Sequence, residues 1–344
     1  MKQLKIGNLV TGENQPILIQ SMLSTPNGDI DAAIKQAKLL EAAGCRILRL
    51  AVPDNDALPV IRALKESTSM PIVADIHFDY KLALASVEAG VDKIRINPGN
   101  IGAEENVKAV ADICNKHNIP IRIGVNGGSL EKSILQKYGA PTAEALVESA
   151  LYHADLLEKF DFHNIVISMK SSDVANMVKA YRLLSQKRDY LLHIGVTEAG
   201  PGMRGVIKNA IGIGALLLDG IGSTIRVSLT DDPVEEIYAA KQILSSLNLL
   251  PGEPQLISCP TCGRTKIDLI TLAKQVERLL ADVHKPIKVA VMGCVVNGPG
   301  EAREADIGIA GGDGEGLLFR HGEVIRKIPF DEIICQLKEE IDKL

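Results

Sequence analysis

The 344-residue chain contains no tryptophan, and aromatic residues make up only 3% of it. Aromatic side chains form the platforms on which proteins stack single-stranded nucleic acid, so their scarcity disfavours that class of protein. The formal net charge of −5 and the lack of a basic run argue against nucleic acid and anionic membranes as well. We therefore expect neither nucleic acid nor a membrane among the partners.

Long hydrophobic runs are also missing. No apolar stretch reaches the length of a transmembrane helix, and the first five residues lack the hydrophobic core of a secretory signal. No Ser/Arg-rich amphipathic leader is present either. With 46% hydrophobic and 24% charged residues, the composition is typical of a soluble globular enzyme, and we expect a cytoplasmic location.

Cysteine is scarce for a chain of this length, with six residues in all. Without a secretory signal, a disulfide framework is disfavoured. Cys45 and Cys114 lie on or beside apolar segments, and Cys335 lies in a C-terminal helical pattern, so we interpret all three as unreactive thiols. The other three cysteines follow a different pattern, which is considered below.

Short β-branched runs alternate with amphipathic helical stretches from residue 16 to about residue 230. The strand candidates begin near eight positions, namely Ile17, Arg46, Pro71, Val91, Ile119, Ile165, Leu191 and Ser223. Eight strand–helix units predict a (β/α)8 TIM barrel. A doubly wound sheet is the alternative fold, but no Gly-x-Gly-x-x-Gly follows the first strand.

The alternation ends in a Pro/Gly-containing linker over residues 247–254. Beyond it we expect a small α+β domain whose strands end at Ser258 and at Met292, with a helix from about Asp268 to Val283 between them. The predicted domains are therefore 1–247, the TIM barrel that binds substrate, and 255–344, a small domain that carries the remaining cysteines.

Cationic side chains are set among aliphatic residues at the predicted barrel strands, where the active site of this fold lies. They are Arg49, Arg95, Arg122, Lys170 and Arg226. The nearby carboxylates are few, Asp75 and Glu198, and unpaired buried cations are costly. We therefore expect a doubly charged or polyphosphate ligand, with scattered structural ion pairs as the alternative.

Neutral and titratable groups accompany these cations. Asn126 and Ser228 end two of the strands and are candidates to complete a phosphate site. His77 and Glu198 are candidate proton donors, and His193 is expected to face the core. Singly, each of these residues also fits an ordinary structural role.

Three cysteines have metal-ligand spacing: Cys259-Pro-Thr-Cys262, and Cys294 in the segment Gly293-Cys-Val-Val-Asn-Gly-Pro-Gly-Glu301. A structural zinc ribbon would repeat the Cys-x-x-Cys unit, but here Asn297 stands where the fourth cysteine would be. Three thiolates suit an iron–sulfur cluster with one iron left for an oxygen ligand or a substrate. Glu301 is the candidate oxygen ligand.

These motifs together resemble those of the 4-hydroxy-3-methylbut-2-enyl diphosphate synthase family of the non-mevalonate isoprenoid pathway. The matching segments are Gln20-Ser-Met22, Val73-Ala-Asp-Ile-His-Phe-Asp79, Arg95-Ile-Asn-Pro-Gly-Asn-Ile-Gly102, Arg122-Ile-Gly-Val-Asn126, Gly195-Val-Thr-Glu-Ala-Gly200, Arg226-Val-Ser228, Cys259-Pro-Thr-Cys262 and Gly293 to Glu301. The resemblance runs nearly from end to end. The short stretch between Ser228 and Cys259 leaves no room for the extra domain of plant-type members, so the two-domain bacterial form is expected.

The resemblance implies a [4Fe-4S] cluster on Cys259, Cys262 and Cys294, with Glu301 on the fourth iron until substrate displaces it. It implies the substrate 2-C-methyl-D-erythritol 2,4-cyclodiphosphate, whose ring is opened reductively with two electrons. By position, the diphosphate would be held by Arg49, Arg95, Arg122, Asn126, Lys170, Arg226 and Ser228.

The same resemblance implies roles in the reaction for Asp75 and His77, and a proton-donor role for Glu198. It also implies a homodimer whose active site is shared between subunits, with reduced ferredoxin or flavodoxin as the electron donor. Two other functions remain open from the residues alone: a zinc-dependent barrel hydrolase of phosphate esters, and a non-catalytic electron-transfer protein. A colourless zinc protein would favour the hydrolase.

Overall fold

The computed structural model describes residues 2–296 and 298–344, so Asn297 of the cysteine motif lies outside the described part. The chain divides into two compact units, Met1–Leu249 and Leu250–Leu344. None of the helices in the described ranges is long and apolar enough to span a membrane.

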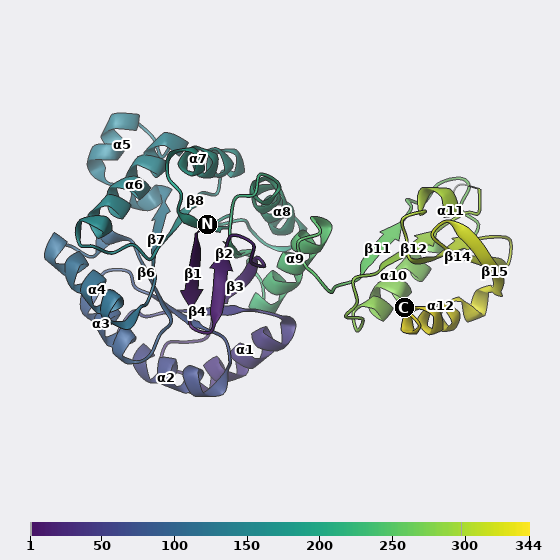
Figure 1. Cartoon of the computed structure of the whole chain (residues 1–344), viewed down its shortest axis with the longest axis horizontal. Coiled ribbons are helices and arrows are strands. Elements are labelled where there is room, and N and C mark those ends of the chain that lie inside the picture. Colours follow the sequence, from purple (N-terminus) through teal and green to yellow (C-terminus); the bar gives the residue numbers. More distant parts are fainter. Residues whose placement is uncertain (1, 297) are drawn as a thin grey trace. The chain divides into compact units, whose positions relative to one another are not determined.

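The first unit contains a closed barrel of eight parallel strands in the order β10-β3-β4-β5-β6-β7-β8-β9 (Figure 1). This confirms the predicted fold class. The barrel strands are β3 (Leu18–Met22), β4 (Ile47–Ala51), β5 (Ile72–Asp75), β6 (Lys93–Ile96), β7 (Ile121–Asn126), β8 (Ile165–Lys170), β9 (Leu191–Ile194) and β10 (Thr224–Ile225). Each begins within about two residues of its predicted start, because runs of β-branched residues are a strong strand signal.

Helices follow the strands and form a ring around the barrel (Figure 1). They are α1 (Ile30–Ala43), α2 (Ala57–Ser67), α3 (Tyr80–Glu88), α4 (Glu104–His117), α6 (Ala143–Lys159), α7 (Val174–Lys187), α8 (Gly202–Leu218) and α9 (Pro233–Ser246), with a short α5 (Lys132–Tyr138) before α6. Local sequence sets their ends. The Asp29 side chain caps α1 by accepting from the Ala32 N–H, and Gly44 ends that helix at a left-handed φ of 103°.

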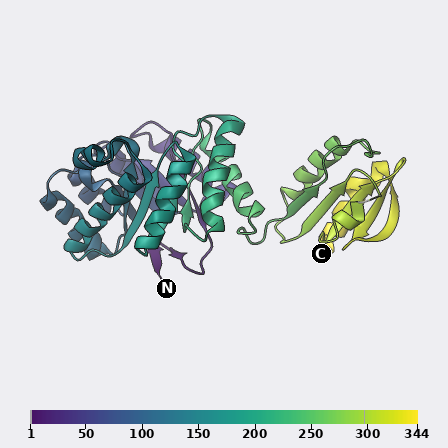
Figure 2. The ribbon, with the colours of Figure 1, turned by 90° about the horizontal axis from the view of Figure 1, so that it is seen from above.

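An antiparallel hairpin that we did not predict precedes the barrel. Its strands are β1 (Gln3–Ile6) and β2 (Leu9–Gly12), and Figure 2 shows the hairpin at one end of the barrel. Leu4 and Ile6 are buried and pack against residues at the amino ends of the barrel strands, including Leu18 and Ile47. The hairpin therefore closes the barrel floor with apolar side chains.

The second unit is a five-stranded sheet in the order β11-β12-β13-β14-β15 with helices packed against it, as the predicted α+β class requires. Its elements are β11 (Gln255–Ser258), α10 (Leu269–Leu280), β12 (Lys288–Met292), α11 (Gly298–Glu301), β13 (Ile307–Gly311), β14 (Glu315–Arg320), β15 (Glu323–Pro329) and α12 (Ile333–Asp342). The edge strand β15 was not predicted. Six of its seven residues are exposed and only Ile328 is buried, so the alternation that marks a half-buried strand is missing.

The loop that carries Glu198 is held by a close approach of helix α8. A β-carbon on Gly205, in the first turn of α8, would collide with the Gly200 carbonyl oxygen. The Thr230 N–H donates to that same carbonyl at 3.3 Å. The loop after β9 can therefore keep its path only because residue 205 has no side chain.

We predict that Gly205→Ala lowers the free energy of unfolding by about 1–3 kcal/mol, because the backbone at Gly200 must move to make room. Gly214→Ala on the same helix is the matched control. A β-carbon there meets no atom within 4 Å, so this change should stabilise the protein by up to about 1 kcal/mol through helix propensity. Urea unfolding of both variants tests this, and equal effects would contradict it.

Candidate active site

Alternation along the strands gives the barrel interior two chemically different levels. The lower level is apolar and contains Leu18, Ile47, Val73, Val166 and Leu191. Every second residue of a strand faces the same side, so the residues two positions further along these strands also face the interior. These residues are polar. They include Gln20, Arg49, Asp75, Ser168 and His193.

Asp75 on β5 joins two of the predicted cations. Its carboxylate accepts from Arg49 Nη2 at 2.5 Å and from Arg95 Nη1 at 2.9 Å. All three residues are buried. Burial alone would raise the pKa of Asp75, but Arg49, His77 and Arg95 together hold it well below its usual value. Asp75 is therefore a carboxylate at neutral pH and fixes both guanidinium groups.

His77 lies just beyond the carboxyl end of β5. Its Nε2 is 3.3 Å from Asp75 Oδ2, and the side chain is 48% exposed. The imidazole is therefore held at one edge by the buried carboxylate and remains accessible to a ligand at its other edge.

Arg226 has a carboxylate partner that sequence reasoning missed. Glu236, in the first turn of α9, accepts from Arg226 Nε and Nη2 at 3.3 Å each. Ser21 Oγ and the Leu229 N–H also donate to Glu236, which is 3% exposed. The sequence did offer a signal for this partner. Glu235 and Glu236 begin an amphipathic helix, and in such a helix one of two adjacent residues faces solvent while the other faces the core.

Arg122 and Lys170 are less well neutralised. Arg122 is 1% exposed and donates from Nη1 to Ser168 Oγ at 2.6 Å, while its Nε and Nη2 have no hydrogen-bond partner among the described residues. Burial, followed by Arg226, Arg49 and Arg122, lowers the pKa of Lys170 well below its usual value. The five predicted cations thus share two carboxylates, Asp75 and Glu236, which leaves a surplus of positive charge.

A pocket of about 760 Å³ opens at the carboxyl ends of the strands and contains three predicted site residues, Asn126, Lys170 and Glu198. Asn126 ends β7 and accepts from the Ser129 hydroxyl at 2.8 Å. Glu198 is exposed on the loop after β9 with φ of 53°, a left-handed conformation that is uncommon for a residue with a side chain. The predicted proton donor is therefore accessible to a ligand in this pocket.

Ser228 lies beyond β10 and is partly buried. Its N–H donates to Asn209 Oδ1 at 3.3 Å, and its carbonyl accepts from Asn209 Nδ2 at 3.1 Å. Asn209 on α8 thus fixes the backbone at Ser228 from both sides. No protein partner is described for the Ser228 hydroxyl.

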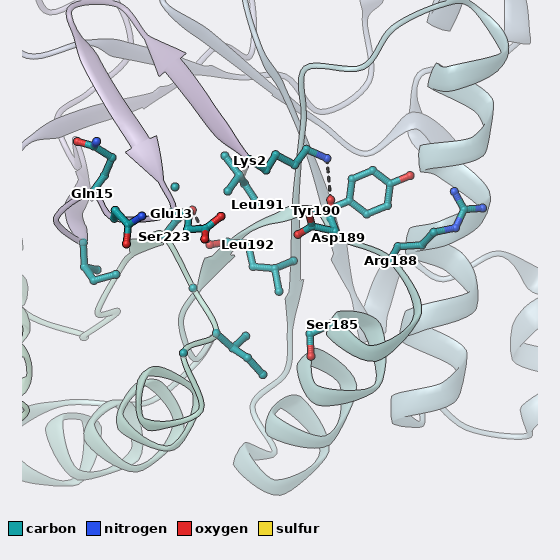
Figure 3. A pocket seen from close by; sticks show the side chains of 16 residues that line it. Lys2, Glu13, Gln15, Ser185, Arg188, Asp189, Tyr190, Leu191, Leu192 and Ser223 are labelled. Atoms are coloured by element: carbon teal, nitrogen blue, oxygen red, sulfur yellow. Dashed lines mark hydrogen bonds between the residues drawn. The ribbon is translucent and has the colours of Figure 1, made fainter.

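A second pocket, of about 430 Å³, lies at the opposite end of the barrel (Figure 3). Its lining includes Lys2, Glu13, Arg188 and Tyr190, and the Lys2 amine donates to the Asp189 carbonyl at 2.8 Å. Residues that begin strands, such as Leu191, form part of its wall. Active sites of this fold lie at the carboxyl ends of the strands, so this pocket is not at the catalytic face.

Two of the three motif cysteines follow neighbouring parallel strands of the second unit. Cys259 follows β11 and Cys294 lies beyond β12, and Ser258 pairs with Val291. The Gly293 N–H donates to Cys259 Sγ at 3.1 Å, which places that sulfur beside the residue that precedes Cys294. These two cysteines therefore lie at one edge of the sheet.

Cys262 is connected to the same edge through its loop. The Thr265 N–H donates to the Cys262 carbonyl at 3.0 Å, and the next residue, Lys266, donates from its N–H to the Gly293 carbonyl at 2.9 Å. Cys262 is exposed, and the backbone N–H of Arg264 is the main cause that lowers the pKa of its thiol. The loop thus favours the thiolate form that ligates metals.

Glu301 ends the short helix α11 and is exposed. Across residues 2–296 and 298–344, no three His, Cys, Asp or Glu side chains converge closely enough to ligate one metal ion. The structure thus gathers the two loops that carry the three motif cysteines without placing their sulfurs at a single point.

The other cysteines fit their predicted roles in part. Burial raises the pKa of Cys45 to about 11 and that of Cys114 to about 12, so both thiols are unreactive as expected. Cys335, in contrast, is exposed on α12. His193 is fully buried and contacts Thr224 Oγ1 at 2.8 Å, which confirms that it faces the core.

Asp75→Asn should lower the free energy of unfolding by about 3–5 kcal/mol near pH 7, because Arg49 and Arg95 lose their shared charge. The folded pKa of Asp75 lies below its unfolded value, so its contribution is complete above the unfolded pKa and is lost as the pH falls below about 4. The difference between variant and wild type should therefore shrink below about pH 4. Chemical unfolding from pH 7 to pH 3 measures this, and a constant difference would contradict it.

Comparison with known proteins assigns both units to one family. Residues 1–241 match the GcpE TIM-barrel domain, and residues 255–343 match the GcpE protein C-terminal domain. Solved structures of low sequence identity share the barrel fold alone. One is the dihydropteroate synthase of Yersinia pestis, which is 14% identical with a TM-score of 0.53 and covers 72% of this chain and 98% of its own.

Full-length relatives carry one name, 4-hydroxy-3-methylbut-2-en-1-yl diphosphate synthase (flavodoxin). The protein of Geobacillus thermodenitrificans is 56% identical over all of this chain and 92% of its own length. That of Clostridium perfringens is 57% identical over all of this chain and 98% of its own. The chain therefore belongs to the GcpE family of 4-hydroxy-3-methylbut-2-en-1-yl diphosphate synthases.

Proposed function

We propose that this chain is an iron–sulfur oxidoreductase that converts 2-C-methyl-D-erythritol 2,4-cyclodiphosphate into (E)-4-hydroxy-3-methylbut-2-enyl diphosphate in non-mevalonate isoprenoid biosynthesis. Membership of the GcpE family supports the reaction. The surplus of buried cations at the carboxyl ends of the barrel strands is the structural observation that carries it. Buried cations without carboxylates need an anionic ligand, and a diphosphate supplies one.

In this proposal the diphosphate is bound by a phosphate well, which we define as Arg49, Arg95, Arg122, Asn126, Lys170, Arg226 and Ser228. Asp75 and Glu236 hold Arg49, Arg95 and Arg226 in place before the ligand arrives. Such fixed charges need little rearrangement during the reaction, which lowers its barrier. Arg122 and Lys170 are the two basic groups of the well for which the described part of the protein supplies no carboxylate, and the diphosphate would supply the missing negative charge.

Loss of the substrate hydroxyl requires a proton so that it departs as water. Glu198 is exposed and lines the same pocket as Lys170, so its carboxyl group is the proposed donor. Asp75 keeps the facing edge of His77 hydrogen-bonded, which orients the imidazole toward the ligand. We propose Asp75 and His77 as the polar groups that position the ring of the cyclodiphosphate.

We propose a [4Fe-4S] cluster bound by Cys259, Cys262 and Cys294, with Glu301 as the fourth ligand. The donor set fits, because a backbone N–H already donates to Cys259 Sγ and Cys262 favours the thiolate. When bound, the cluster would supply single electrons and a Lewis-acidic iron for the departing oxygen. The three thiolates would hold the cluster, and the Glu301 carboxylate would be its exchangeable ligand.

The finer assignments belong to the same proposal. Residues 1–247 form the substrate-binding domain, and residues 255–344 form the cluster domain. The protein works as a cytoplasmic homodimer whose subunits share the active site, and reduced flavodoxin, the donor in its relatives' names, or ferredoxin delivers the electrons.

Anaerobically purified protein, supplied with reduced flavodoxin and the cyclodiphosphate, tests the proposal. We expect a brown protein that forms one diphosphate product for every two electrons consumed. A protein that remains colourless after anaerobic reconstitution, contains stoichiometric zinc and ignores the reductant would refute it.

We predict that Lys170→Met raises the Michaelis constant for the cyclodiphosphate by about 10-fold or more, because a charged phosphate contact contributes about 1.5–3 kcal/mol. Lys170 is suited to this test because its removal breaks neither the Asp75 nor the Glu236 ion pairs. Lys179→Met is the matched control, since Lys179 lines the same pocket but pairs with Glu144. Equal effects of the two changes would argue against the phosphate well.

We also predict that Glu301→Ala retains the visible absorption of the cluster but loses most turnover, because three thiolates are enough to hold it. Absorption spectra and steady-state rates measure the two effects. Glu304→Ala, on an exposed neighbour, is the control and should leave both unchanged. Full activity of Glu301→Ala would rule out the ligand role.

A further inference from the structure

Lys93 is a buried cation that the proposed mechanism does not use. It is the first residue of β6, two positions before Arg95, so both side chains lie on the same face of the strand. Arg95 reaches Asp75 and the Gly124 carbonyl across the barrel interior, which identifies that face as the inner one. Lys93 is 0% exposed, and its Nζ has no hydrogen-bond partner among the described residues.

Further buried polar atoms of the barrel interior also lack hydrogen-bond partners within the described ranges. They are Gln20 Nε2 and Oε1, Arg122 Nε and Nη2, and His193 Nε2, each without a hydrogen-bond partner in the described part of the chain. The register partner of Lys93, Val73, belongs to the apolar cluster with Leu4 and Ile6. The charged group that acts on the Lys93 amine is Arg122 of the phosphate well.

The charged and titratable groups that face the barrel interior come from β4 to β9 and from the segment after β10. They are Arg49 of β4, Asp75 of β5, Arg95 of β6, Arg122 of β7, Lys170 of β8, His193 of β9, and Arg226 just after β10 with its partner Glu236 of α9. Cations outnumber carboxylates. Asp75 and Glu236 are already committed to arginines, so no carboxylate is left for Lys93.

Burial, followed by repulsion from Arg122, lowers the pKa of Lys93 well below its usual value. An ammonium with no counterion in this position is strongly disfavoured. In the free protein, burial and the charge of Arg122 therefore favour the neutral amine over the ammonium.

A bound diphosphate would favour the protonated form of the Lys93 amine instead. Its negative charges at Arg122 and Lys170 offset the repulsion that keeps the Lys93 amine neutral, and two charges of opposite sign interact strongly in a site with little water. We propose that Lys93 takes up a proton from solvent when a diphosphate occupies the phosphate well, and so acts as a positioning residue that adds a positive charge beneath Arg122.

The inference rests on the phosphate well of the proposed function and extends it. The step is a simple protonation: the amine lone pair accepts the proton, and no bond of the ligand breaks. His193 is the weaker candidate because imidazole is intrinsically less basic than an amine and its Nδ1 already contacts Thr224. Lys170 lines the ligand pocket itself, so its protonation is a separate contribution.

Proton uptake makes binding depend on pH in a defined direction. A ligand that binds with uptake of protons binds more tightly at lower pH, and the slope of log affinity against pH equals the number taken up. Removal of Lys93 should therefore flatten this slope. A residue with a purely structural role would shift affinity by the same factor at every pH.

The experiment uses the intact holoenzyme without reductant, titrated calorimetrically with inorganic diphosphate in two buffers of different ionisation enthalpy. On binding diphosphate, Lys93→Met should take up fewer protons than the wild type, with a difference of up to about one proton per site. Its log affinity should also depend less steeply on pH between about pH 6.5 and pH 9. Lys108→Met is the control, because Lys108 is exposed and pairs with Asp112; it should match the wild type.

Methionine keeps the length of the lysine stem and removes the unpaired amine, so the variant should fold, and Lys93→Gln serves as a second variant. Equal proton uptake by wild type and Lys93→Met overturns the inference. Failure of the wild type to bind inorganic diphosphate overturns both the inference and the phosphate well. A Lys93-dependent uptake in a protein that does not turn over the cyclodiphosphate supports the inference and refutes the proposed function alone.

Discussion

The excess of positive charge inside the barrel is the constraint on which the rest of this structure depends. Arg49 and Arg95 share Asp75, and Arg226 is held by Glu236, while Arg122 has only a serine hydroxyl. A core of this kind is expensive without its ligand, because buried ions are stable only when paired. In the proposed function, the anionic substrate supplies the negative charge that these buried cations lack.

Such a core is tolerated because the apolar parts of the fold are separate from it. The floor is filled by aliphatic side chains and closed from below by the hairpin residues Leu4 and Ile6. The helices pack against the outward-facing aliphatic residues of the same strands, such as Ile94 and Ile123. Stability therefore comes from the floor and the outer layer, which leaves the upper interior free for function.

The second unit brings the segments that carry its three motif cysteines to one edge of its sheet. Parallel pairing of β11 with β12 brings the carboxyl ends of both strands to one edge of the sheet. There, backbone hydrogen bonds of Gly293 join its segment to the loop that carries Cys259 and Cys262. Backbone donors to sulfur also stabilise the thiolate form. The sheet thus brings the cysteine-bearing segments together, although the three sulfurs do not converge on one point among the described residues.

The sequence by itself determined the barrel, the positions of its eight strands and the chemical class of the site. Hydrophobic periodicity is local, and the arginines set in aliphatic strands and the Cys-x-x-Cys spacing are visible without coordinates. It did not predict the β1–β2 hairpin or the edge strand β15, whose short or exposed runs give a weak periodic signal.

Only the tertiary structure decided which charges are paired. Glu236 reaches Arg226 across the gap between a helix and a strand, and Lys93 is isolated because its neighbours on other strands are arginines and aliphatic residues. These facts depend on contacts between segments that are distant in the sequence. Electrostatic energies vary steeply with distance and burial, and both are set by packing rather than by the order of the residues.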